Sequence, residues 1–349
     1  MAVEPSDRLT LRRSGLRLTR LGFGAASIGG LFSAVSDEGA VATATAAWDL
    51  GIRLFDMAPL YGYGAAERRM GLALAGRPRD EYVLSTKVGR LVRGVDAIPP
   101  GADIDQQALD GREDAFYART EPVRLVFDFT ADGVRRSIEE SLDRLRLDRI
   151  DIALIHDPDD HWEQAIGEAW PALARMRDEG MIRAVGAGMN QSAMLARFAR
   201  EGDFDVFLLA GRYTLLDQEA LAELLPLCVE HEIGILLGGV MNSGVLADPR
   251  PGSRFNYQPA SAAIVERARR LAAVCDRHGV PLQAAAVQFP LAHPAVVSLI
   301  AGVRRIDHLA EYPELMRQPI PAALWDDLRA EGLLPPEAPV PGVATGPAA

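Results

Sequence analysis

The sequence contains only two cysteines, Cys228 and Cys275, in 349 residues. So few cysteines argue against a disulfide framework and a cysteine-rich zinc site, and they favour a reducing, cytoplasmic compartment. Long apolar runs are also missing, since no stretch approaches the ~20 residues that cross a bilayer. Residues 1–13 lack the apolar core of a signal peptide. We therefore expect no membrane partner.

Basic charge is scarce as well. The 37 Lys and Arg residues are outnumbered by 48 Asp and Glu, which gives a formal net charge of -11. This balance argues against nucleic acid as a partner, because nucleic acids are bound by clustered Lys and Arg. The share of hydrophobic residues, 48%, and of charged residues, 24%, is that of an ordinary globular enzyme. The length allows either two domains or one α/β barrel.

Short apolar segments recur along the chain and alternate with longer stretches of helical periodicity. Several of them are apolar throughout, as in strands that are covered on both faces. We predict eight strands, at residues 21–23, 52–55, 83–86, 150–155, 182–185, 206–209, 233–237 and 296–300. Helices are clearest at 132–145, where Thr130 is placed to cap the first turn, and at 163–178 and 261–278.

This order of elements predicts a single parallel (β/α)8 TIM barrel. Segments 9–12 and 16–19, which flank Ser14 and Gly15, predict a hairpin that closes its bottom. The alternative is an open doubly wound sheet, but residues 22–27 do not complete the glycine pattern typical of that fold. We assign residues 1–334 to the barrel and 335–349 to a loose C-terminal tail, and we expect the long segment 88–128 to be a lid or binding loop.

Four polar residues fall where three neighbouring strands are predicted to end. Asp56, Lys87 and His156 follow the second, third and fourth strands, and Tyr61 lies shortly after Asp56. Each residue alone is usually a cap, a solvated charge or a packing ring, but the carboxyl ends of barrel strands are where catalytic residues meet. A lysine beside a tyrosine lowers the pKa of the phenol, a carboxylate holds the lysine, and a histidine orients a substrate oxygen. Such a group suits proton transfer coupled to hydride transfer.

The same residues lie in motifs that resemble those of the aldo-keto reductases. Residues 51–64 (Gly-Ile-Arg-Leu-Phe-Asp-Met-Ala-Pro-Leu-Tyr-Gly-Tyr-Gly) resemble the family signature, with Met57 in place of the usual Thr. Residues 84–88 and 154–158 resemble the lysine and histidine strands of the family. The resemblance implies that Tyr61 is the acid–base residue, that Lys87 and Asp56 tune it, and that His156 orients the substrate.

The resemblance also implies a nicotinamide cofactor, NAD or NADP, and no metal. Its predicted binding residues are Gly24, Ala25, Asp56, Met189, Asn190, Arg212, Gly238, Gly239, Asn242, Ser243, Gly244, Gly302, Arg304, His308 and Glu311. Gly302 and Val303 replace the Lys-Ser pair with which the family often holds the 2′-phosphate of NADP. The tyrosine that often stacks on the nicotinamide is not found in residues 237–244. These departures and the acidic net charge favour NAD without deciding between the two cofactors.

Residues 186–190, 210–216 and 242–244 resemble a branch of the family that holds the L-fucose and D-threo-aldose 1-dehydrogenases and pyridoxal 4-dehydrogenase. The resemblance implies oxidation of the anomeric carbon of an aldose to a lactone. The alternatives are an NADPH-dependent aldehyde or ketone reductase, a pyridoxal 4-dehydrogenase, and a cofactor-sensing regulatory subunit. We expect a small sugar or aldehyde as the only partner, and a monomer or small homo-oligomer.

The identity of the substrate depends on three loops, at residues 28–33, 88–128 and 240–248. Trp162 either lines the pocket or packs on the fourth helix. His156 and His161, with aspartates between them, suggest a metal site, but the segment is predicted to be a loop that does not align the two imidazoles. We therefore predict no metal there.

Overall fold

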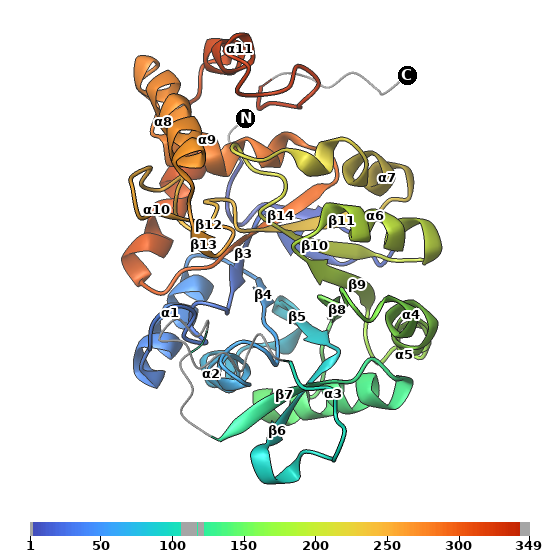
Figure 1. Ribbon diagram of the computed structural model, residues 1–349. Helices are drawn as coiled ribbons and strands as arrows, with labels where there is room; N and C mark the ends of the chain where they lie inside the picture. Colours follow the sequence, from blue (N-terminus) through green and yellow to red (C-terminus); the bar gives the residue numbers. More distant parts are fainter. Residues whose placement is uncertain (1–2, 106–116, 118–121, 343–349) are drawn as a thin grey trace.

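Eight parallel strands form a closed barrel in the computed structural model, which describes residues 3–105, 117 and 122–342 (Figure 1). Each strand pairs with the next along the barrel, and the last pairs with the first. All eight predicted strands and the barrel are confirmed, with ends shifted by a few residues. The strands are β3 (Leu21–Gly24), β4 (Leu54–Asp56), β5 (Val83–Val88), β8 (Ile152–His156), β9 (Ala184–Met189), β10 (Val206–Ala210), β11 (Gly234–Gly238) and β14 (Val296–Ala301).

Helices surround the barrel on its outside (Figure 1). Thr130 caps α3 as predicted, because its hydroxyl accepts a hydrogen bond of 3.0 Å from the amide of Gly133. The helix predicted at 163–178 is interrupted by a π-helical turn at Ala165–Ala169. The helices are α1 (Asp37–Asp49), α2 (Ala65–Leu74), α3 (Ala131–Leu145), α4 (Trp162–Gln164), α5 (Trp170–Asp178), α6 (Ser192–Glu201), α7 (Leu224–Glu230), α8 (Ala262–Arg277), α9 (Leu282–Gln288), α10 (Ile306–Arg317) and α11 (Ala322–Ala330).

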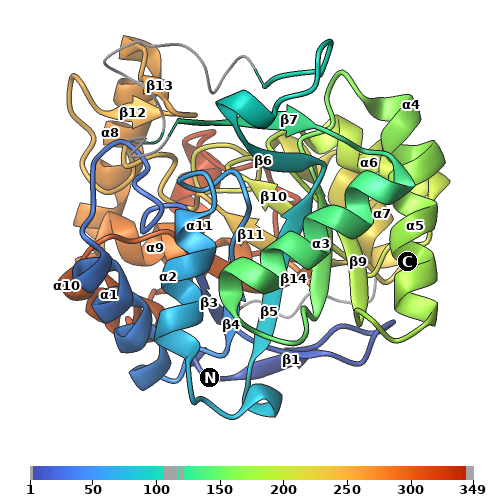
Figure 2. The same ribbon diagram turned by 90° about the horizontal axis from the view of Figure 1, so that it is seen from below.

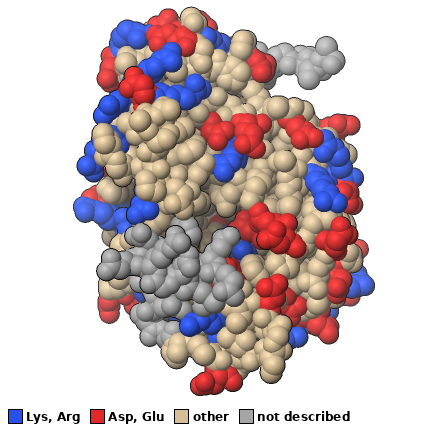
Figure 3. Space-filling view, viewed as in Figure 1, with Lys and Arg blue, Asp and Glu red and all other residues tan. Residues whose placement is uncertain are grey.

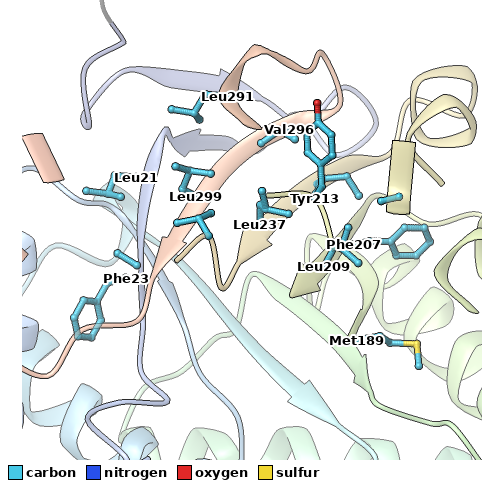
Figure 4. Packing of buried hydrophobic residues seen from close by; sticks show 14 of the residues in the cluster. Leu21, Phe23, Met189, Phe207, Leu209, Tyr213, Leu237, Leu291, Val296 and Leu299 are labelled. Carbon is cyan, nitrogen blue, oxygen red and sulfur yellow. The ribbon is translucent and has the colours of Figure 1, made fainter. Parts of the chain in front are cut away.

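Most buried apolar side chains form two separate layers. The larger layer lies between the strands and the helices, and Figure 4 shows part of it, including Phe23, Phe207 and Leu299. The second layer is built from alternate residues of the same strands, such as Leu208 and Leu236. Because side chains of a strand point alternately to its two faces, this second layer fills the interior of the barrel.

A hairpin of β1 (Arg8–Thr10) and β2 (Arg17–Thr19) closes one end of the barrel, as predicted. Figure 2 shows β1 at the end opposite to the hairpins described below. Leu11 between the two strands is 1% exposed and belongs to the interior layer. A Cβ atom on Gly234 would lie 2.3 Å from Leu11 Cδ2, so only glycine leaves room for this leucine at the start of β11.

The carboxyl end of the barrel carries two small antiparallel hairpins. One joins β6 (Arg90–Gly94) to β7 (Val123–Phe127) and is formed by the two ends of the long segment 88–128. The other joins β12 (Arg254–Phe255) to β13 (Gln258–Pro259). Residues 106–116 and 118–121 of the long segment lie outside the described residues.

The C-terminal segment packs against the barrel domain further than the sequence indicated. Ala338 and Val340 are 1% and 2% exposed, and Arg329 Nη2 donates a hydrogen bond of 2.9 Å to the carbonyl of Ala338. The expected loose tail from residue 335 is therefore packed up to Val340, and residues 343–349 lie outside the described part of the chain. Among the described helices, none has the length and apolarity to cross a membrane.

Candidate active site

The structure brings the four predicted polar residues together at the carboxyl end of the barrel. Asp56 is the last residue of β4, Lys87 lies in β5 and His156 is the last residue of β8, and these three strands are adjacent. Lys87 Nζ lies 4.6 Å from the centre of the Tyr61 ring, and the rings of Tyr61 and His156 are 5.9 Å apart between centres. The spacing along the sequence therefore becomes proximity because the strands pair in sequence order.

Lys87 is the single lysine of the 349-residue sequence, and its side chain is 1% exposed. Its ammonium donates hydrogen bonds of 2.8 Å to Asp56 Oδ2 and 2.9 Å to the carbonyl of Met57. Ser85 Oγ donates a bond of 3.0 Å to the other carboxylate oxygen of Asp56. Buried polar groups need such partners, and these bonds fix the lysine beneath the tyrosine ring.

Tyr61 is held by a close approach of two loops. Gly62 has a φ of +64°, and a Cβ atom there would lie 2.2 Å from the carbonyl oxygen of Gly29. A side chain at either glycine would separate the loop after β3 from the turn that carries Tyr61. The glycine that follows the tyrosine thus positions its ring in the pocket.

The pKa of Tyr61 differs from the one that the sequence predicted. Burial, together with the negative charge of Asp56, raises the pKa of the phenol well above its ordinary value. The lowered pKa that the sequence predicted for this phenol is not found, because burial and the Asp56 carboxylate, which lies 2.8 Å from the Lys87 ammonium, act in the opposite direction. In the free protein Tyr61 therefore keeps its proton at neutral pH.

His156 is held neutral. Burial, and to a smaller extent the charges of Arg90 and Lys87, lower the pKa of the imidazole well below its ordinary value. Its Nδ1 atom is buried and has no hydrogen-bond partner among the described residues. A neutral imidazole carries one N–H group and can donate one hydrogen bond to a ligand oxygen.

These side chains open onto a cavity of about 200 Å³ at the carboxyl end of the barrel. Its wall has a polar part, formed by Arg90, Asp105 and Asp157 beside Lys87 and His156. It also has an aromatic part, formed by Tyr63, Tyr117 and Tyr257 beside Tyr61. The remaining lining residues, all of them small or apolar except Asn190, come from β9 and β10 and from the loops after β3, β4 and β9: Ala26, Leu31, Leu60, Gly188, Met189, Asn190, Leu208 and Ala210.

Sequence reasoning missed the residues that the loops contribute to this wall. Tyr117 lies within the segment predicted as a lid, and its ring centre is 6.0 Å from that of Tyr61. Tyr257 lies in the turn between β12 and β13, where its amide donates a hydrogen bond of 3.0 Å to Ser243 Oγ. The sequence signal for both was only their place in long loops after strands. An aromatic ring is thus present near the seventh strand, although not within residues 237–244.

Two of the predicted cofactor residues, Met189 and Asn190, line the cavity directly. Gly24 ends β3, and the amide of Ala25 donates a hydrogen bond of 2.8 Å to the carbonyl of Asp56. Gly238 and Gly239 follow at the end of β11. These positions surround the same end of the barrel.

Arg212 lies in the loop after β10 and carries a buried Nη1 atom that has no hydrogen-bond partner in the described residues. Its nearest carboxylates, on Asp217 and Glu219, are 3.9 Å away. A buried donor without a partner is costly unless a ligand satisfies it. Together with the small residues at the ends of β9, β10 and β11, this donor fits a ligand rich in acceptor oxygens, as a nicotinamide dinucleotide is.

Other predicted cofactor residues have different surroundings. The side chain of Asn242 is buried and hydrogen bonds within the protein, accepting from Thr214 Oγ1 at 2.6 Å and donating to the carbonyl of Gly211 at 3.2 Å. Ser243 accepts a hydrogen bond from the Tyr257 amide and Gly244 forms an isolated bridge with Arg254. The loop between β14 and α10 exposes Gly302 and Arg304, and the first turns of α10 expose His308 and Glu311.

Trp162 packs on the helices and does not line the cavity, since its ring centre is 4.5 Å from that of Phe198. His161 bonds through Nε2 to Asp103 at 2.8 Å. Within the described part of the chain, no group of three or more His, Cys, Asp or Glu side chains is arranged to hold a metal ion.

Comparison with known proteins identifies the family to which this barrel belongs. The model of the Aldo/keto reductase family matches residues 20–330. A D-threo-aldose 1-dehydrogenase from Pseudomonas sp is 44% identical over 92% of this chain and 96% of its own. A pyridoxal 4-dehydrogenase from Microbacterium luteolum is 40% identical over 96% of this chain and 100% of its own.

Solved structures agree on the fold. The holo form of aldo-keto reductase AKR11C1 from Bacillus halodurans superposes with a TM-score of 0.71 at 24% identity, covering 93% of this chain and 96% of that one. The glycerol dehydrogenase AKR11B4 from Gluconobacter oxydans gives 0.70 at 22% identity, covering 98% and 99%. The chain belongs to the aldo/keto reductase family and is a nicotinamide-dependent oxidoreductase that acts on CH–OH groups.

Proposed function

We propose that this chain is an aldose 1-dehydrogenase, which oxidises the anomeric carbon of a cyclic sugar to a lactone. The observation that carries the proposal is the convergence of Tyr61, the Lys87–Asp56 pair and neutral His156 on one cavity. The proposal is also supported by the 44% sequence identity to D-threo-aldose 1-dehydrogenase over nearly the whole of both chains.

In this mechanism each of the four side chains has one task. Tyr61, as the phenolate, takes the proton of the anomeric hydroxyl. The ammonium of Lys87, fixed by Asp56, stabilises the negative charge of that phenolate from 4.6 Å away. His156 donates its one N–H to the same substrate oxygen and orients it. A bound nicotinamide cofactor supplies the acceptor for the hydride that leaves C1.

Within this proposal we assign NAD as the cofactor. The resemblance of residues 302–308 to the phosphate loop of the family implies that a 2′-phosphate would lie near them, where it would need a free cation. Arg304 is bonded to Ser33 Oγ, and Arg305 is paired through two nitrogens with the carboxylate of Asp307. A phosphate would have to displace these bonds and approach Asp307, which disfavours NADP.

The test is a panel of free aldoses with NAD and with NADP at alkaline pH, followed by the Tyr61→Phe variant. We expect NAD-dependent lactone formation, and a fall in kcat of about 10²–10⁴ in the variant, since this is the usual contribution of acid–base catalysis. Tyr82→Phe is the matched control, because Tyr82 is buried in the core and does not line the cavity. A Tyr61→Phe variant with wild-type kcat contradicts the assignment.

A second candidate is oxidation of pyridoxal, which one observation favours. The rings of Tyr63, Tyr117 and Tyr257 line the cavity, and aromatic faces suit a flat aromatic substrate. The relative named pyridoxal 4-dehydrogenase is 40% identical. Pyridoxal therefore belongs in the panel, and a kcat/KM for pyridoxal above that for every aldose would decide for this candidate.

A further inference from the structure

Asp157 occupies a distinctive place in the cavity wall. It follows His156 at the end of β8, and its side chain is 21% exposed toward the pocket that it lines. The shortest polar contact of its carboxylate is 3.5 Å, to His156 Nε2. Among the residues that the structure describes, no donor makes a hydrogen bond to this carboxylate, so its oxygens are available to a ligand.

The backbone at Asp157 is held in a conformation that few residues adopt. Its φ is +39°, in the left-handed region that side chains other than glycine rarely enter. Its amide donates to the carbonyl of Gly188 at 3.1 Å. On the other side, Arg90 Nη1 donates a bond of 2.6 Å to the carbonyl of His156. Arg90 is therefore a positioning residue, which fixes the peptide from which the Asp157 side chain projects.

The negative charge of Asp157 is not paired with a cation of the described cavity wall. Each cation in the lining is already paired with a carboxylate: Lys87 with Asp56 at 2.8 Å, and Arg90 with Asp105 at 2.9 Å. Burial raises the pKa of Asp157 to about 6, with Arg90 acting in the opposite direction. The group is thus ionised at the alkaline pH of the assay, and the charged lining residues that the structure describes, together with Asp56, sum to one net negative charge.

A free carboxylate among paired charges accepts hydrogen bonds from hydroxyl groups and repels anions. The geometry points to Asp157 as the residue that binds substrate hydroxyl groups and makes this cavity select neutral polyhydroxylated substrates over anionic ones. The substrate class is then a free, unphosphorylated sugar without a carboxylate. This inference rests on the proposed sugar-oxidising function and adds the charge and the hydroxyl groups of the substrate to it.

The test compares binding and turnover of an aldose and of the corresponding uronic acid, which differs by one carboxylate. Binding is measured by calorimetry in the presence of saturating reduced nicotinamide cofactor, so that the aldose cannot be oxidised, and the absorbance of the cofactor verifies that none is consumed by reduction of the open-chain aldehyde. For the wild type we expect the aldose to bind at least tenfold more tightly than the uronate. In Asp157→Asn this preference should fall to within about twofold, and in Asp157→Ala the KM for the aldose should rise about 10–100-fold, the worth of a charged hydrogen bond.

The matched control is Asp160→Asn, which removes an equal charge from an exposed residue of the same loop outside the cavity lining. It should keep the wild-type preference for the aldose. Melting curves of all variants verify that they are folded. The inference is overturned if Asp157→Asn discriminates as the wild type does, or if the wild type binds the uronate as tightly as the aldose or binds neither. If discrimination depends on Asp157 but no aldose is oxidised, the proposed function fails and the binding role stands.

Discussion

The proton on Tyr61 gives the two directions of the proposed reaction different pH dependences. A tyrosine with a raised pKa is an abundant acid at neutral pH and a scarce base. The reduction of a carbonyl needs the acid, whereas the oxidation of a hydroxyl needs the base. His156 adds no titration near neutrality because its pKa lies well below the ordinary value.

We therefore expect the single-turnover rate of sugar oxidation to rise with pH, about tenfold for each unit, while the pH remains below the pKa of Tyr61. The rate of aldehyde reduction should stay nearly constant above about pH 7, where Asp157, with a pKa of about 6, is already ionised. Stopped-flow absorbance of the reduced nicotinamide at several pH values measures both rates. An oxidation rate that does not change with pH would show that Tyr61 is not the base.

At the level of single residues, the catalytic side chains could be predicted from the sequence more completely than the residues that line the pocket. Asp56, Tyr61, Lys87 and His156 were found because strand ends and family motifs mark them. Asp157 was noticed only as part of a rejected metal site. Its role depends on a backbone turn and on the pairing of other charges, and neither property can be seen in a linear pattern.

At the level of elements, a buried ion pair joins α2 to α3. Glu67 in α2 is fully buried and accepts hydrogen bonds of 2.8 Å from Thr86 Oγ1 in β5 and 2.6 Å from Arg144 Nε in α3. The pair ties the helix that follows the Tyr61 turn to its neighbour. Loss of one partner of a buried pair is costly, because the remaining charge stays away from water.

Arg144→Met should lower the free energy of unfolding by about 3 kcal/mol. Urea unfolding monitored by circular dichroism measures this value. Arg12→Met is the control, because the Arg12–Glu232 pair is exposed and should contribute only ~0–1 kcal/mol. Equal effects of the two substitutions would contradict the structural role of the buried pair.

At the level of the whole molecule, the N-terminal hairpin completes the barrel interior. Leu11 is buried at the bottom, whereas Leu9 on the same hairpin is 42% exposed. Leu11→Ala should lower the free energy of unfolding by about 2–5 kcal/mol, the usual cost of a cavity in a packed core. Leu9→Ala should change it by less than about 0.5 kcal/mol. Thermal melts followed by urea titrations compare the two variants, and equal stability would mean that the hairpin does not seal the barrel.

The barrel itself could be predicted because eight apolar segments alternate with amphipathic helices in the order of the strands. The packing of segment 335–340 could not be predicted, because few apolar residues mark it and its burial depends on where the chain returns. The same holds for the hairpins at the carboxyl end, whose short strands are defined by their pairing in space. The local hydrophobic pattern thus predicts the repeated strand–helix units of the barrel. The elements outside these units depend on tertiary contacts, which the local pattern does not show.

The charge of -11 is spread over the surface, and Figure 3 shows acidic and basic side chains interspersed on one face. Since the only lysine of the sequence is buried, the basic groups seen there are arginines. Open-chain aldoses and aldehydes condense with lysine amines to form imines, the first step of glycation, and guanidinium groups do not form such imines. A surface without lysine therefore offers no side-chain amine for imine formation with the reactive carbonyls that the proposed function would bring to it.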